Sequence, residues 1–229
     1  MLRTPAPLIG ALGITRNRVE GPLSQDSVAD LKEGELIRRL LAERHWRERI
    51  LNIKGIPDGA TPLLEVELDD LGKRGDIDIL LVHPSQPEKA TAIQAKRLKV
   101  GPRAFISGKP NRFKDIKKLY EQTNLVLDLG FWQTFSFLFI VVDSRIRNLG
   151  KMQYDGVTTG LRETIDRNLD GNGLRPEAGL VIVEITQPMN DRPLGAGTSS
   201  IQCRRLPCER SQPRNVTQWV IKKLAESDA

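Results

Sequence analysis

The spacing of apolar and charged residues in the first part of the chain predicts a long helix. Apolar residues recur every three or four positions over residues 28 to about 49, with charged residues between them, which is the pattern of an amphipathic helix. The polar residues 24–27 predict its start. The segment 49–56 is expected to form a short strand, and the Pro-Asp-Gly sequence at 57–59 then breaks the chain.

Three strands joined by short turns are predicted next. Residues 63–68 alternate apolar with acidic side chains, as a half-exposed strand does. Residues 76–82 and 91–98 are two apolar runs, and the gap between them is rich in proline and other turn residues. Because strands joined by short turns pair in opposite directions, these segments are expected to form an antiparallel meander.

The rest of the chain predicts alternating helices and strands, with a flexible loop at 188–200. The expected helices are 113–129, 157–169 and 216–225, and the expected strands are 135–142 and 180–185. The strand at 135–142 follows a helix and should therefore run parallel to a neighbour. The fold class is thus α/β, with a central mixed β-sheet flanked by helices. Residues 1–24 are expected to form an irregular N-terminal arm. Residues 25–229 should form a single domain with its core at about 28–185.

Polar residues on the two central strands form a candidate site. Because side chains alternate along a strand, Asp76 and Asp78 should share a face, with the apolar residues between and after them facing the core. Gln94 and Lys96 likewise share a face of the next strand. If the two polar faces coincide, these oxygen-bearing side chains could bind Mg²⁺, with Mn²⁺ as a substitute, together with a substrate phosphate. The lysine could orient a water or stabilise the transition state.

Charge adds a candidate partner. The chain carries a net charge of +6 and has a pI of about 9.5, and a basic balance favours nucleic acid. Basic residues cluster directly after the candidate site, where they could contact phosphates; a solvated helix face and loop is the alternative interpretation. The candidate nucleic-acid contacts are Arg97, Lys99, Arg103, Arg112 and Lys114.

Composition narrows the class of protein. Apolar residues make up 39% and charged residues 28% of the chain, as in soluble globular proteins. The apolar runs are too short to cross a membrane, so no membrane partner is expected. Two cysteines do not make a disulfide framework, which favours a reducing, cytoplasmic setting.

The order of these elements and motifs resembles the PD-(D/E)XK nuclease superfamily, which has a restriction endonuclease-like fold. That family has a helix with a glutamate, then a meander with an Asp and an E/Q-x-K, then a helix and a further strand. The resemblance lies in Gly75-Asp76-Ile77-Asp78-Ile79 and Gln94-Ala95-Lys96 and covers about residues 30–142. This chain matches the branch with a D…QxK motif, in which Gln replaces the commoner acid.

The resemblance implies a role for each motif residue. Asp78 corresponds to the metal-binding aspartate, with Asp76 as the competing assignment, and Lys96 corresponds to the catalytic lysine. Gln94 would complete the metal site. Glu35 corresponds to the helix glutamate, an accessory metal ligand, with Glu33 as the alternative.

The sequence therefore supports a hypothesis and an alternative. The main hypothesis is a Mg²⁺-dependent endonuclease that hydrolyses phosphodiester bonds, with DNA as the expected substrate. The alternative is a catalytically inactive nucleic-acid-binding or assembly subunit that keeps the nuclease fold. A homodimer or a targeting partner protein is compatible with either.

Overall fold

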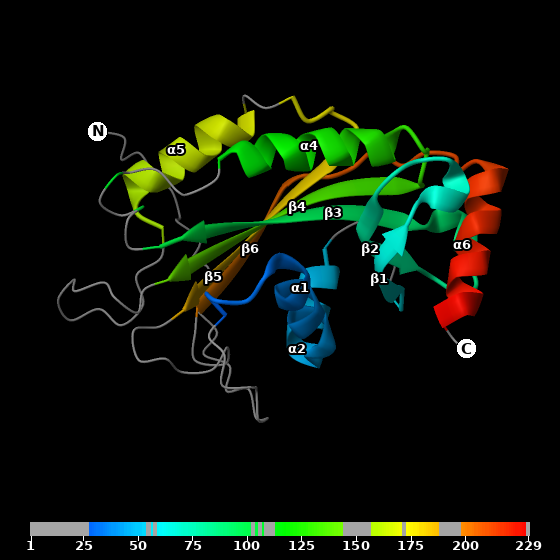
Figure 1. The fold of residues 1–229 in the computed structure, drawn as a ribbon, viewed down its shortest axis with the longest axis horizontal. Coiled ribbons are helices and arrows are strands. Elements are labelled where there is room, and N and C mark those ends of the chain that lie inside the picture. The colour runs from blue at the N-terminus through cyan, green and yellow to red at the C-terminus, as the bar shows by residue number, and fades with distance from the viewer. Residues whose placement is uncertain are drawn as a thin grey trace, which may run out of the picture.

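The computed structural model describes residues 28–53, 56, 59–101, 104, 107, 113–143, 157–170, 173–187 and 198–227. Helices and strands alternate along these residues, as Figure 1 shows. The elements are α1 (Glu33–Ala42), α2 (Arg44–Leu51), β1 (Thr61–Glu67), η1 (Asp69–Leu71), β2 (Asp76–Val82), η2 (Pro87–Lys89), β3 (Thr91–Val100), α4 (Lys114–Leu127), β4 (Gln133–Asp143), α5 (Thr159–Asp170), β5 (Gly179–Gln187), β6 (Thr198–Arg205) and α6 (Arg214–Ser227).

The strands form one mixed sheet in the order β1-β2-β3-β4-β5-β6. The first three strands are an antiparallel meander, β3, β4 and β5 are parallel, and β6 returns antiparallel to β5. The parallel pairs follow crossovers that contain α4 and α5, because parallel neighbours cannot be joined by a tight turn. The predicted α/β class, with a mixed sheet flanked by helices, is confirmed.

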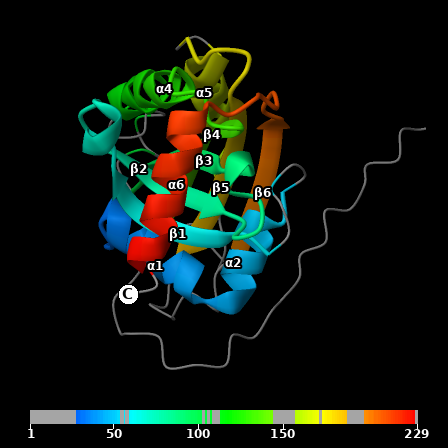
Figure 2. The same cartoon turned by 90° about the vertical axis from the view of Figure 1, so that its right-hand side faces the viewer.

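Helices cover both faces of this sheet. On one face α1 and α2 bury Leu36, Leu40 and Ile50 against the sheet, where they pack with Phe137. On the other face lie α4 and α5, and α6 lies across β1 and β2 (Figures 1 and 2). The central strand β4 is buried along its whole length. This burial on both faces explains its continuous apolar sequence.

Two predicted elements differ from the structure. The single helix expected at 28–49 is wrong: α1 begins only at Glu33, and a break at Glu43, whose φ of −78° and ψ of 113° are not helical, separates it from α2. Residues 49–51 belong to α2, so the strand expected at 49–56 is also wrong there. The apolar spacing continues through the break because Leu36 and Ile50 face the same core.

The strand β6 was not predicted, since residues up to 200 were expected to form a loop. It is an edge strand with little apolar content, and Ile201 is its contact with the core. The remaining predicted strands and helices are confirmed within two residues or so, including the C-terminal helix, which spans Arg214–Ser227. The N-terminal arm, residues 1–24, lies outside the described residues. No helix in the described part of the chain is long and apolar enough to span a bilayer.

Candidate active site

The sheet opens between β2 and β3 at Asp78. The two strands pair from Leu81 and Thr91 down to Ile79 and Ile93, and their pairing ends there. On its other side β2 stays paired with β1 as far as Asp76, with an interruption at Asp78. The segment of β2 that carries the acids therefore leaves β3 but remains in the sheet, and one edge of β3 is left without a strand beyond Ile93.

Two carboxylates take the place of the missing strand. The Ala95 N–H donates to Asp78 Oδ2 at 2.7 Å, and the Arg97 N–H donates to Glu33 Oε2 at 2.7 Å. Alternate residues of a strand point their N–H groups to the same edge, so these are consecutive donors along the open edge of β3. Buried main-chain donors need acceptors, and side chains of β2 and α1 supply them. The open edge thus fixes both acids close to each other.

Lys96 lies between Ala95 and Arg97 in β3, and its ammonium interacts with both acids: it is hydrogen-bonded to Glu33 and attracted by the charge of Asp78. Its Nζ is 2.8 Å from Glu33 Oε1, and 14% of the Lys96 side chain is exposed. Burial by itself would lower the pKa of Lys96. The hydrogen bond to Glu33 and the charges of Asp78, Glu33 and Asp76 outweigh burial, so the pKa is raised above its ordinary value. The side chain is therefore held as an ammonium at neutral pH.

The carboxyl group of Asp78 has the opposite balance. Burial raises its pKa to about 6, against the Ala95 hydrogen bond and the Lys96 charge, which lower it. The acidic neighbours Glu33 and Asp76 raise it further. A buried carboxylate beside other acids is costly to ionise, so a cation at this position would stabilise the charged form.

Gln94 is oriented by a hydrogen bond across the opening. Its Nε2 donates to the Asp76 carbonyl at 2.7 Å, and the side chain is buried. Because a main-chain carbonyl only accepts, the nitrogen must face it and the oxygen Oε1 must point elsewhere. Gln94 can therefore offer a carbonyl oxygen to a cation. Asp76 interacts electrostatically with Asp78 and Lys96, while Asp78 makes the contact with β3.

The helix acid that the structure brings to Lys96 is Glu33. Glu35 instead binds Arg39, one turn along α1, at 3.0 Å. The two acids are two residues apart and so lie on nearly opposite sides of the helix. The apolar pattern placed residue 33 inside a longer helix, whereas it is the first residue of α1. The late start of α1, which the pattern did not show, brings the Glu33 carboxylate to the edge of β3.

The backbone of β2 departs from regular alternation at Asp78, which corrects the expected apolar face. Ile79 and Leu81 pack beneath α1, but Ile77 belongs to the cluster with Leu80 on the other face of the sheet. The neighbouring strand is irregular at the same level: Glu65, which lies between the partners of Ile77 and Ile79, has a φ of 51°. A simple period of two therefore does not describe the strand at the site.

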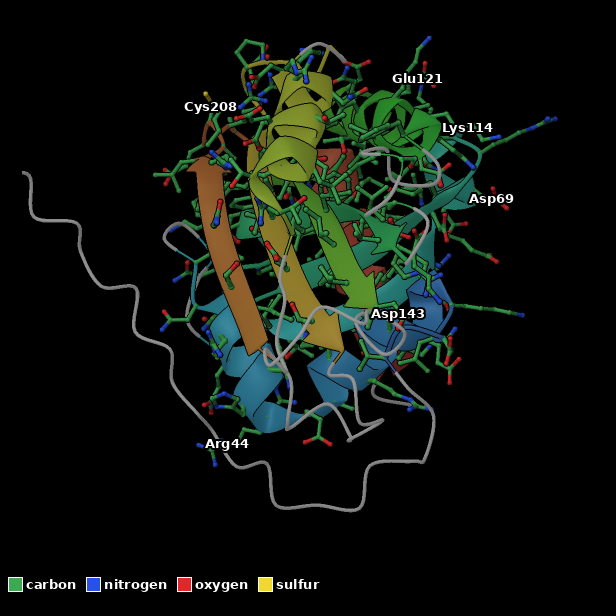
Figure 3. All side chains as sticks on the ribbon, turned by 90° about the vertical axis from the view of Figure 1, so that its left-hand side faces the viewer. Arg44, Asp69, Lys114, Glu121, Asp143 and Cys208 are labelled. Carbon is green, nitrogen blue, oxygen red and sulfur yellow. The ribbon has the colours of Figure 1, made fainter. Side chains whose placement is uncertain are left out.

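The basic residues proposed to bind nucleic acid lie in different surroundings. The Arg97 guanidinium donates to the carbonyls of Leu31 and Ala29, just before α1. Lys99 lies 3.4 Å from an Asp30 oxygen and 3.5 Å from one of Asp143, at the end of β4 (Figure 3). Lys114 is exposed at the start of α4. Arg103 and Arg112 lie outside the described residues.

The oxygen atoms of Asp78 and Gln94 are suitable ligands for a hard cation. Carboxylate and amide oxygens are the ligands that Mg²⁺ prefers, with water completing its shell, and Asp78 and Gln94 supply one of each. Among the described residues no group of three or more His, Cys, Asp or Glu side chains is placed to hold a metal ion. Any cation here would therefore keep several waters or take oxygens from a substrate.

Comparison with known proteins finds a distant structural likeness and no family. No protein-family model matches the chain, and no curated protein matches it. Among solved structures, Pyrococcus furiosus SfsA in complex with Ca²⁺ is 12% identical, with a TM-score of 0.28. The match covers 75% of this chain and 65% of that one, so this chain corresponds to less than two thirds of the neighbour. A likeness of this size carries no functional argument, and the function must be inferred from the site.

Proposed function

We propose that the protein is a metal-dependent nuclease that hydrolyses phosphodiester bonds, with DNA as its expected substrate. The observation that supports it is a pair of contacts where the sheet opens. The Ala95 N–H donates to the Asp78 carboxylate at 2.7 Å, and the Lys96 ammonium donates to the Glu33 carboxylate at 2.8 Å. The D…QxK order of the motif, in a fold of the expected α/β class, supports the resemblance to the PD-(D/E)XK nucleases.

The metal would be held chiefly by Asp78 and by Oε1 of Gln94. Asp76 and the helix acid would be accessory, and the position of Glu33 favours it over Glu35 in that role. Mg²⁺ at this place, or Mn²⁺ as its substitute, would lower the pKa of a bound water and offset charge on the phosphate. Asp78 must then be ionised, which its burial, together with the neighbouring acids, opposes in the absence of a cation.

Lys96 would act through its charge. Because its pKa is raised, the ammonium stays protonated and suits the stabilisation of the anionic transition state or the orientation of the attacking water. It is a poor general base for the same reason. Glu33 holds the ammonium at the open edge of β3, so that little side-chain freedom is lost when substrate binds.

The net charge of +6 would attract the negatively charged backbone of a nucleic acid. Lys99 and Lys114, together with Arg103 and Arg112, remain the expected phosphate contacts, and Arg97 is expected to help position the segment that precedes α1. Cutting both strands of a duplex would favour two active sites related by symmetry. A homodimer or a targeting partner is therefore part of the proposal.

The test is cleavage of supercoiled and linear DNA, single-stranded DNA and RNA, each with Mg²⁺, Mn²⁺ or EDTA. Wild type should cleave only with metal, and Lys96→Ala should lose cleavage. Lys117→Ala is the matched control, because Lys117 also pairs with a glutamate, Glu121, but lies on the surface of α4. Equal behaviour of wild type and Lys96→Ala on every substrate would contradict the proposal. Metal-independent binding without cleavage would indicate the inactive binding module instead.

A further inference from the structure

A small pocket lies beside Asp78, between α1 and β1. A guanidinium and two carboxylates border it. Its lining residues are Gly34, Ile37, Arg38, Leu64, Glu65 and Asp78. Arg38 is not among the residues that hold Lys96 or the edge of β3, so the proposed metal site does not account for it.

The Arg38 guanidinium is occupied by a carboxylate of the protein itself. Its Nη2 lies 2.7 Å from Glu65 Oε2, and the two side chains are 57% and 47% exposed. Exposed ion pairs contribute little to stability, because water screens the two charges. An external anion can therefore replace Glu65 at small cost, and a guanidinium binds phosphate oxygens in the same forked geometry as a carboxylate.

Glu65, the carboxylate partner in this pair, has an unusual backbone conformation. Its φ is 51°, and it is the one non-glycine residue with positive φ in the described part of the chain. Such a conformation is unfavourable for a residue with a side chain and is maintained by its surroundings, often at functional sites. Its neighbours Leu64 and Val66 pair with Ile79 and Ile77, the residues on either side of Asp78. Glu65 and Asp78 line the same pocket, so the residue with positive φ lies at the candidate site.

Gly34 provides the space in which the Glu65 carboxylate sits. A Cβ at position 34 would lie 2.5 Å from Glu65 Oε1, which is closer than a Cβ carbon approaches an oxygen that is not bonded to it. The colliding atom is the end of a flexible side chain. An alanine at this position would therefore displace the carboxylate and leave the helix intact.

We propose that Arg38 binds a backbone phosphate of the nucleic acid, and that Glu65 occupies its guanidinium until the phosphate displaces it. This inference rests on the proposed function, which makes nucleic acid the substrate. Besides Glu65, the acid that acts on Arg38 is Glu35, which is itself paired with Arg39. In the pocket the phosphate would lie beside Asp78, which places Arg38 on the substrate side of the proposed metal position.

Two substitutions release Arg38 in different ways. Glu65→Gln removes the competing charge, whereas Gly34→Ala moves the carboxylate and changes no charge. Each should tighten binding to a short labelled DNA duplex by about 1.5- to 5-fold, the range that corresponds to an exposed ion pair. Arg38→Ala should weaken binding and lower the salt dependence of log K by about 0.9, the loss of one phosphate contact. With Arg38→Ala present, Gly34→Ala should have no effect.

The measurement is fluorescence anisotropy in EDTA, over a range of salt concentrations. Arg44 and Glu48 provide the matched control: they form an equally short exposed pair at 2.7 Å on α2, and Figure 3 shows Arg44 at the outer end of that helix. Glu48→Gln measures the general effect of removing one negative charge. Thermal unfolding of each variant checks that it is folded.

The proposal is overturned if Arg38→Ala binds DNA no more weakly than Arg44→Ala, if no variant binds DNA, or if the gain from Gly34→Ala persists without Arg38. Because EDTA prevents metal-dependent cleavage, this result is separate from the nuclease assay. Loss of the Arg38 effect with intact cleavage removes only this inference. The expected binding pattern without any cleavage removes only the enzymatic proposal.

Discussion

The Asp78 carboxylate accepts the main-chain N–H of Ala95 at 2.7 Å, at the position where a carbonyl of β2 would lie if the sheet stayed closed. One acid therefore has two properties. It completes the hydrogen bonding of β3, and it is a buried charge beside other acids. A structural acceptor could equally be neutral, so the charge of Asp78 calls for a different explanation, which the proposed cation would supply.

Asp78→Asn should stabilise the metal-free protein at neutral pH. The pKa of Asp78 is raised from 3.8 to about 6 on folding, so the folded state binds a proton more tightly than the unfolded state between these values. The stabilisation from protonation is fully present below pH 3.8 and is lost as the pH rises through about 6. At pH 7 the ionised Asp78 therefore lowers the free energy of unfolding by up to about 3 kcal/mol, and an asparagine, which carries no charge, does not.

The measurement is urea unfolding of wild type and Asp78→Asn in EDTA at several pH values. The asparagine can still accept from Ala95 through Oδ1, so the local hydrogen bond is kept. The difference between the two proteins should grow from pH 4 to pH 7, and nuclease activity should be lost. A difference that does not change with pH would mean that Asp78 titrates normally.

Glu33→Gln and Glu35→Gln separate the two helix acids. Glu33 touches Lys96 and the Arg97 N–H, whereas Glu35 touches Arg39. Glu33→Gln should lower cleavage by about 10- to 100-fold, the usual loss when a group that orients a site residue is removed. It should also move the alkaline limb of the pH–rate profile to lower pH, because Glu33 raises the pKa of Lys96.

Glu35→Gln is the matched control and should leave both the rate and the profile close to wild type. A merely structural role for Glu33 would lower stability without shifting the profile. Equal effects of the two substitutions on the profile would show that the Lys96–Glu33 contact has no part in catalysis.

Gln94→Glu should lower the stability of the metal-free protein and increase the stabilisation that a metal ion provides. The amide nitrogen now donates to the Asp76 carbonyl at 2.7 Å. A carboxylate would face that carbonyl with no proton to share, which should cost about 1 to 3 kcal/mol. A cation would offset the added charge, so Mn²⁺ should raise the melting temperature of Gln94→Glu more than that of wild type. Unchanged stability in EDTA would show that the Gln94–Asp76 bond contributes little.

The sequence was sufficient for the strands β1 to β5, because these strands differ in how they are covered. The continuous apolar run of β4 reflects helices on both faces, and the acidic alternation of β1 reflects an edge strand. The edge strand β6 carries almost no apolar signal. The break at Glu43 does not interrupt the apolar spacing, because α1 and α2 bury residues against the same core.

The candidate site was predictable only to the level of its motifs. Asp78, Gln94 and Lys96 could be chosen as candidates because each lies on a strand that the apolar pattern predicts, and because their order resembles a family motif. The choice between Glu33 and Glu35 depends on where α1 begins, and helix starts are set by tertiary contacts such as the Glu33 bond to Arg97. The opening between β2 and β3, and with it the irregular alternation at Ile77, depends on pairing that no local pattern encodes.

Anomalous diffraction from crystals soaked in Mn²⁺ tests the central claim most directly, because it locates the ion without reference to activity. The account predicts a peak in the opening between β2 and β3, bound by the carboxylate of Asp78 and by Oε1 of Gln94, and absent from Asp78→Asn crystals. A well-ordered site with no ion at Asp78, or an ion bound only elsewhere on the protein, would contradict it.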